Sequence, residues 1–507
     1  MSSDAEDQGR MAKAADVDFD DLIVFQRVLD ARDGEDAVAV GLEVLANGDV
    51  IGAGTRGLIA QIAIDHDDSS LLAEIAGVLR RRVQSAAPLS LDLYHLGNVL
   101  MQVSELDGCG DPDRYLQGHP ERREGRRALA MTGDLDDDES ATKALTNLGN
   151  WLDGSGRWVE AYDAYLTALE REPDNGMAYG NAAELLFWRS LQPGAHQPHL
   201  YALGCELALL ERAHRDKTLL YGGHLAAARF DTFPTDGGGV HPQTPPEESY
   251  ARWVEDERLA LGLTVEGLAV GPQWDDVGID RLHVASERIG ASVPALFAMM
   301  NTIKQDYLLA RQLAFHALGR VPAADTATYA NTLDEAVYGQ GPAELTLAQR
   351  AALDLLDRLA VMVNEYLEIG IDPRRVTFKG LWTVNKHAEW RPAIRDEVAK
   401  GNRSILALAD LSFDLDDGGY LFPFKSLRNA GTHRFVVLHD VVDTFDPSNA
   451  VEHMDLADYE ESLLATLRIA RAAILYVVEL IRVREERIAP GGPAVYLDVP
   501  DHHPGRG

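Results

Sequence analysis

Apolar residues recur at intervals of three and four along most of the chain, which places them on one face of an α-helix. Pro and Gly cluster between these periodic segments. No stretch stands out with the alternation of period two that is typical of strands. The pattern therefore predicts an all-α protein.

One stretch in the first half spaces small and large residues as two nesting helices require. From Leu145 the chain reads Leu-x2-Leu-Gly-x2-Leu, followed by Ala161, Tyr165, Ala168 and Pro173. This spacing matches a tetratricopeptide repeat (TPR). One repeat cannot bury its own apolar face, so neighbouring helical pairs must stack on it. We interpret residues 22–230 as a TPR-like helical solenoid, with an irregular helical domain as the alternative.

A second periodic region follows a break in the pattern. Residues 231–274 contain Gly-Gly-Gly and Pro-Pro and are predicted to form a linker and a bridging segment. Three long apolar stripes within residues 275–487 suit a helical bundle. The acid-rich residues 1–21 are expected to be disordered, and the Pro- and Gly-rich residues 488–507 to form a flexible tail.

Composition narrows the partners and the compartment. The net charge of −34 over 507 residues disfavours a general attraction to nucleic acid or to an anionic membrane, so any RNA contact must be a local patch or must depend on a partner. Two cysteines cannot supply a disulfide framework or a four-thiolate zinc site, which suggests a reducing compartment. The longest apolar stretch, Ile469 to Ile481, is too short to span a bilayer. We therefore expect a cytoplasmic protein without membrane contact.

The second region offers no histidine or glutamate pair at metal-binding spacing, and we expect no metal and no cofactor. The run from Asp414 to Gly419 resembles a calcium loop, but Lys425 stands where the loop needs a bidentate glutamate. We interpret this run as a solvated loop.

An arginine followed five positions later by a histidine occurs at least three times, among them Arg311 and His316, Arg428 and His433, and Arg434 and His439. The first pair lies on the flank and at the end of a predicted helix. The third pair encloses the apolar run 435–438, which we expect to be helical. The second pair differs, because Asn429 follows the arginine directly, Gly431 loosens the centre, and Lys425 and Arg434 add positive charge.

Such a pair can cut RNA without a metal. The ribose 2′-hydroxyl attacks the adjacent phosphate, Arg428 can clamp that phosphate, and His433 can move the proton. On a regular helix, positions five apart diverge by roughly 140°. Either Gly431 bends the segment, or each residue serves a cleft assembled from two copies of the chain. The second option predicts a homodimer.

The segment from Leu427 to His433 resembles the motif of the HEPN superfamily, in which four to six residues separate Arg from His and a polar residue follows the Arg. Two earlier segments, from Met300 to Arg311 and from Asp357 to Tyr366, extend the resemblance to a bacterial HEPN family with TPR-like repeats in front. The resemblance covers about residues 250–487. It implies a helical bundle that dimerises and cleaves RNA to leave a 2′,3′-cyclic phosphate, often as a toxin or in defence against phage.

The resemblance also implies roles for single residues. Arg428 and His433 would be the catalytic pair, and Asn429 would orient the phosphate or the histidine. Asp306 and Asp357 could support the arginine, and Asn364 could line the cleft. Each of these last three also has an ordinary structural alternative, such as pairing a buried backbone group. Lys425 and Arg434 would contact substrate phosphates.

The sequence leaves three hypotheses about the function. The first is a ribonuclease whose solenoid binds an unknown protein partner or trigger. The second is a non-catalytic HEPN-like scaffold for dimerisation or for binding RNA or protein, which the net charge of −34 favours. The third is an antitoxin-like partner of a nucleotidyltransferase.

Overall fold

The computed structural model describes residues 19–47, 51–84, 89–104, 110–135, 137–192, 197–237, 249–262, 275–279, 281–283, 293–320, 327–330, 332, 334–385, 387–421, 435–440, 450–488 and 494–496. Helices dominate these residues and strands are few, which confirms the predicted all-α class. Among the helices described, none combines the length and the apolar character needed to cross a membrane. The predicted disordered residues 1–18 lie outside the described part of the chain.

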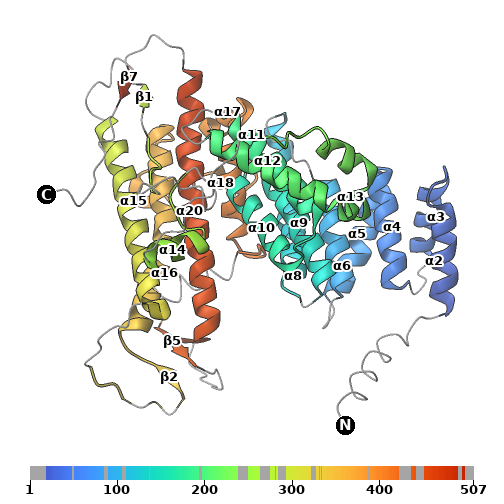
Figure 1. Ribbon diagram of the computed structural model, residues 1–507, viewed down its shortest axis with the longest axis horizontal. Coiled ribbons are helices and arrows are strands. Elements are labelled where there is room, and N and C mark those ends of the chain that lie inside the picture. The colour runs from blue at the N-terminus through green and yellow to red at the C-terminus, as the bar shows by residue number, and fades with distance from the viewer. Residues whose placement is uncertain are drawn as a thin grey trace.

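The first half of the chain is a row of short helices, each packed against its neighbours (Figure 1). Their bounds are α2 (Phe19–Ala31), α3 (Ala37–Ala46), α4 (Ala53–Asp65), α5 (Ser69–Val83), α6 (Ser90–Val103), α7 (Pro112–Gln117), α8 (His119–Gly133), α9 (Asp138–Gly154), α10 (Trp158–Arg171), α11 (Gly176–Ser190), α12 (Gln197–Ala213) and α13 (Arg215–Phe230). We call this part the helical row.

The pair α9 and α10 shows why the small residues of the repeat are needed. A Cβ atom on Gly149 would lie 2.3 Å from the ring of Tyr165, so only glycine lets the two helices approach this closely. The Tyr165 hydroxyl donates a hydrogen bond of 2.8 Å to Asn150 on the facing helix. Ala161 and Ala168 are fully buried in the same contact region. The residues that define the repeat motif are therefore the ones that pack.

The second half is a bundle built around three long helices that lie side by side in Figure 1, α15 (Val293–Phe315), α16 (Gln340–Tyr366) and α20 (Leu456–Arg487). Shorter elements complete it, namely α14 (Ser249–Asp256), the π-helical turn η2 (His316–Arg320), the 3₁₀ turn η3 (Pro373–Arg375), α17 (Pro392–Ala399) and α18 (Arg403–Asp414). Nearly every residue of α20 from Ile469 to Ile481 is buried, because neighbours cover this helix on all sides.

Three small sheets decorate the bundle. β1 (Arg281–His283) pairs antiparallel with β7 (Ala494–Tyr496), and β3 (Thr383–Val384) pairs with β4 (Glu389–Trp390). The third sheet has the order β2 (Ala336–Val337), β5 (Phe435–His439) and β6 (Val451–Asp455). Strand β7 falls in the predicted flexible tail and fixes the chain there, beside β1.

The prediction of a helix around residues 435–438 is wrong. Phe435–His439 is the central strand β5, antiparallel to β2 and parallel to β6. The run Phe-Val-Val-Leu combines aromatic and β-branched residues, which fit a pleated surface better than a helix. Two neighbouring strands are available, and their pairing decides the structure.

The helical row and the bundle share one hydrophobic core. A continuous cluster of buried side chains runs from Tyr115 in α7 through α10 and α11 into α15, α16, α18 and α20. The predicted bridging segment joins this core through Trp253, Leu259 and Leu261. The first helices, α2 to α6, enclose a second cluster of their own. The two halves therefore pack as one body.

Candidate functional site

The five predicted site residues Lys425, Arg428, Asn429, His433 and Arg434 lie outside the described residues, in the segment 422–434. The elements on either side are described. The chain enters this segment from α18 and the turn that ends at Leu421, and it leaves into β5 at Phe435. How α18 and β5 are held therefore describes the two ends of the chain that flank this segment.

A buried ionic cluster anchors α18 to the helical row. Asp410 and Asp414 lie four residues apart, hence on one face of α18, and both are fully buried. Their partners are three fully buried arginines of the helical row: Arg122, Arg126 and Arg157.

The geometry is specific. Arg126 bridges both carboxylates, with Nη1 3.0 Å from Asp410 and Nε and Nη2 2.8 and 3.0 Å from the two oxygens of Asp414. Arg157 pairs with Asp414, and Arg122 lies 3.4 Å from Asp410. The Tyr115 hydroxyl donates a 2.8 Å hydrogen bond to Asp410. Hence the two carboxylates of α18 are held almost entirely by residues of α7, α8 and the start of α10.

Charge complementarity makes this burial possible. Burial alone would raise the pKa of Asp410, but Arg122 and Arg126 outweigh it and the pKa of the carboxyl lies well below its usual range. The interpretation of Asp414 as part of a solvated loop is wrong, because its side chain is completely enclosed by arginines. The sequence could not reveal this, since the arginines lie more than 250 positions away.

A second ionic contact joins the two halves through α20. Glu479 accepts hydrogen bonds from the Trp158 indole, at 2.9 Å, and from Arg189, at 2.5 Å. Burial would raise the pKa of Glu479, but the charge of Arg189 and the hydrogen bonds from Arg189 and Trp158 together outweigh burial and lower it. The helical row is thus tied to the bundle through α20 as well as through α18.

The three supporting candidates have local structural partners. Asp306 pairs with Arg358 between α15 and α16. Asp357 accepts a 2.7 Å hydrogen bond from the backbone N–H of Phe378. Asn364 is buried, and its amide donates to the carbonyl of Ile371 at 2.9 Å and accepts from the N–H of Ile371 at 3.0 Å. Asn364 thus pairs a buried backbone group, which is the structural alternative that the sequence left open.

Arg311 and His316 have the same spacing as the predicted catalytic pair, but Arg311 has a structural role. Arg311 is buried and makes a bidentate ion pair with Asp275, at 2.7 and 2.9 Å. It also donates to the Leu259 carbonyl and to the Tyr250 hydroxyl, each at 2.9 Å. Arg311 therefore fastens the bridging segment to α15.

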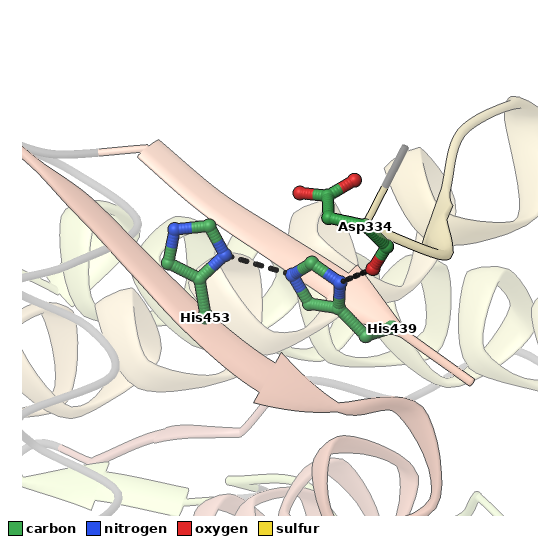
Figure 2. A group of neighbouring side chains, drawn as sticks. All are labelled: Asp334, His439 and His453. Carbon is green, nitrogen blue, oxygen red and sulfur yellow. Dashed lines mark hydrogen bonds between the residues drawn. The ribbon is translucent and has the colours of Figure 1, made fainter. Parts of the chain in front are cut away.

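The sequence analysis missed one group of residues that could bind a metal ion. Asp334, His439 and His453 meet at the sheet of β2, β5 and β6 (Figure 2), with one potential ligand atom from each within 4.8 Å of the others. His439 lies 105 positions after Asp334, and His453 lies 14 positions after His439, so no short sequence motif predicts the group. Only the pairing of β5 with β6, which the helical interpretation of residues 435–438 excluded, could have brought the two histidines together.

The helical row carries a pocket of about 470 Å³ between α6, α9, α11 and α13. Its lining is mixed and includes Tyr94, Lys143, Asn147, Asn175 and Tyr221. Asn147 donates to Asn98 at 2.9 Å and to Tyr94 at 3.3 Å, so these polar groups have fixed positions. Asp137 and Glu139 also line the pocket, and Glu139 pairs with Lys143 at 2.6 Å, so amides, hydroxyls and both signs of charge face a polar ligand there.

A family model described as LA2681-like HEPN matches residues 288–484, about two fifths of the chain. The match begins just before α15, ends within α20, and includes the segment 422–434 and the sheet of β2, β5 and β6. No curated protein and no solved structure matches the chain.

Proposed function

The carboxy-terminal bundle of this chain is a HEPN superfamily domain, and from this premise we propose that the protein is a metal-independent endoribonuclease. The observation that carries the proposal is the overlap of this domain with the segment that contains Arg428, Asn429 and His433. These residue types in this order fit the chemistry of RNA cleavage by internal attack.

In the proposed reaction, His433 accepts the proton of the ribose 2′-hydroxyl as its oxygen attacks the adjacent phosphorus. The bond from phosphorus to the 5′-oxygen breaks, and the leaving 5′-oxygen takes up a proton to become a hydroxyl. Arg428 stabilises the charge that builds on the phosphate, and Asn429 orients that phosphate or His433. The products are a 2′,3′-cyclic phosphate and a 5′-hydroxyl. Lys425 and Arg434 contact neighbouring phosphates.

Two copies of the chain would share the cleft. Positions 428 and 433 point in directions roughly 140° apart on a straight helix, so a pair of copies can place one Arg428 beside the other His433. The proposal therefore includes a homodimer formed through the bundle. Light scattering coupled to size exclusion tests it, and a strictly monomeric protein that cleaves RNA would rule out the shared cleft.

The helical row would act as the regulatory part of a toxin or defence effector. Two observations support this: its polar pocket can receive a partner or a trigger, and its arginines hold the helix that leads into segment 422–434. A ligand that shifts α8 or α10 would therefore bear directly on α18. If the protein is a toxin, its expression in bacteria should reduce colony formation, and His433→Ala should relieve that effect.

The decisive experiment uses mixed RNA, purified full-length protein and EDTA. Wild-type protein should produce fragments with cyclic phosphate ends, and both Arg428→Ala and His433→Ala should lose at least about 100-fold in rate, as expected for loss of a general base or an oxyanion donor. His316→Ala is the matched control, because it removes the histidine of a pair with the same spacing. Equal cleavage by all four proteins would refute the site.

A non-catalytic HEPN scaffold is the second candidate, and the net charge of −34 favours it. It predicts no cleavage under any condition and dimerisation that is unaffected by Arg428→Ala or His433→Ala. The same set of proteins therefore separates the two candidates.

A further inference from the structure

We propose that Asp334, His439 and His453 bind a divalent transition-metal ion, with Zn²⁺ as the best-fitting probe. The proposal goes beyond RNA cleavage and does not depend on it. Figure 2 shows the three side chains meeting beside β5 and β6, with the two imidazole rings in direct contact. One nitrogen of each histidine and one carboxylate oxygen lie within 4.8 Å of one another.

The protonation of His439 is arranged as in a metal ligand. Its Nδ1 lies 2.9 Å from the backbone carbonyl oxygen of Asp334. A carbonyl only accepts, so Nδ1 carries the proton and Nε2 of the neutral ring presents a lone pair. A backbone carbonyl that fixes the tautomer in this way is the usual outer partner of a metal-binding histidine.

That lone pair faces the second histidine. Nε2 of His439 lies 2.8 Å from Nδ1 of His453 (Figure 2). Two nitrogens bound to one tetrahedral Zn²⁺ at about 2.0–2.1 Å each are about 3.3–3.4 Å apart. Separation of the rings by roughly half an ångström would therefore admit the ion. The rings would also turn so that both nitrogen lone pairs point at the ion, and the proton on Nδ1 of His453 would move to Nε2 of the same ring, so that both imidazoles stay neutral.

Asp334 supplies the anionic ligand. The Thr332 hydroxyl donates a hydrogen bond to its carboxylate and so helps to hold that group in place beside β2. The backbone N–H of Ala336 also approaches this carboxylate, at 3.4 Å. One negative charge and two neutral imidazoles form a mixed nitrogen and oxygen set, which favours zinc and similar ions over Mg²⁺ or Ca²⁺.

The sheet provides a rigid frame. His453 is paired with Val437 on β5, and His439 lies two residues further along that strand, so both histidines project from the same face. His439 is also paired with Ala336 of β2, two residues from Asp334. His439 is fully buried, whereas Asp334 and His453 are half-buried, which leaves a route for the ion. Three protein ligands leave one tetrahedral position for water.

The ion would fasten β5 between β2 and β6. His439 lies six residues after His433, at most about 22 Å along an extended chain. The metal therefore serves as a clamp on the strand that follows segment 422–434, and it takes no part in the proposed RNA chemistry.

The test uses full-length protein without a histidine tag, because a tag would itself bind zinc. Isothermal titration with ZnCl₂ should give one site per chain with a Kd below 1 µM, and MgCl₂ should give none. His453→Ala and Asp334→Asn should each weaken zinc binding at least about 10-fold. His316→Ala, which removes a histidine of the same domain outside the cluster, should bind zinc as wild type does.

Co²⁺ gives a second readout that does not depend on stability. The wild-type protein should show the visible absorption of tetrahedral cobalt, and His453→Ala should lose it. Wild-type protein with no saturable zinc site, or equal zinc binding by wild type and His453→Ala, would overturn the proposal and leave a histidine–histidine hydrogen bond of purely structural role. Because these readouts involve no RNA, their failure is separate from failure of the nuclease assignment.

Discussion

Arg126 donates two hydrogen bonds, of 2.8 and 3.0 Å, to the two carboxylate oxygens of Asp414, and both side chains are completely buried. This pair joins α8 to the last residue of α18. It lies at the centre of a cluster that couples the helical row to the helix preceding segment 422–434. The same guanidinium also reaches Asp410, so one arginine serves two carboxylates.

Loss of Arg126 should be strongly destabilising. Arg126→Ala would leave two buried carboxylates with fewer partners, and breaking a buried pair in this way typically costs about 3–5 kcal/mol. Urea unfolding followed by tryptophan fluorescence measures the change. Arg395→Ala is the matched control, since Arg395 also bridges the two halves through Asp113, yet both side chains are half exposed. This control should lower the free energy of unfolding far less, because solvent screens an exposed ion pair, and equal losses in both variants would contradict the prediction.

Gly149→Ala should disrupt the contact of α9 with α10. The new methyl group would meet the Tyr165 ring at 2.3 Å, and overpacking of this kind costs about 1–3 kcal/mol. Gly77→Ala in α5 is the control, because its methyl group would only touch Arg81 at 3.7 Å. That change should stabilise the helix by about 0.5–1 kcal/mol. Thermal unfolding of the two variants should therefore shift in opposite directions from wild type, and a stabilised Gly149→Ala would show that the helices can move apart.

Acidification should weaken the protein in a defined range. His119 packs against Phe413 and His387 at the junction of the two halves. Burial at this place lowers the pKa of His119 to about 4. The unfolded chain takes up this proton near pH 6.5, before the folded protein does. The contribution of His119 is thus complete above about pH 6.5 and is lost as the pH falls towards 4.

The size of this effect is up to about 3 kcal/mol, since each unit of pKa shift corresponds to about 1.4 kcal/mol. Burial also lowers the pKa of His95 to about 4 and lowers that of His387, so at least three histidines act in the same direction. His119→Gln should therefore remove a part, but not all, of the loss in unfolding free energy between pH 6.5 and 4.5. An unchanged pH profile in this variant would assign the acid sensitivity to other groups.

Asn364 offers a way to separate support of the fold from participation in catalysis. Asn364→Ala would leave the N–H and carbonyl of Ile371 unpaired and should cost about 1–3 kcal/mol. If its role is structural, the rate of RNA cleavage per folded molecule should stay within about twofold of wild type. A drop of 10-fold or more at a temperature where the variant is fully folded would instead place Asn364 in the cleft.

The helices could be predicted from the sequence because a packed helix repeats its apolar residues at short, regular intervals. The spacing of Leu145, Gly149 and Tyr165 predicted a contact that the structure contains. The three long stripes in residues 275–487 correspond to α15, α16 and α20. In each case the residues that carry the signal lie within a few turns of one another.

Features that depend on partners far away in the sequence could not be predicted from it. Asp414 looked like a loop residue because its arginines come from another part of the chain. His439 looked helical because β6, which makes it a strand residue, begins 12 positions later. The same omission hid the cluster with Asp334. Pairing over long distances in the sequence leaves no local periodic trace.

The shared core limits how this protein can be taken apart or recombined. A bundle expressed alone would expose Asp410 and Asp414 without their arginines, together with the apolar surface of α18 and α20 that now faces α10. It should therefore aggregate rather than fold as a separate domain. Exchange of the helical row between related proteins would fail unless Arg122, Arg126 and Arg157 were carried along. The two halves are therefore expected to be inherited as one module, and a new specificity must arise by substitutions within the row.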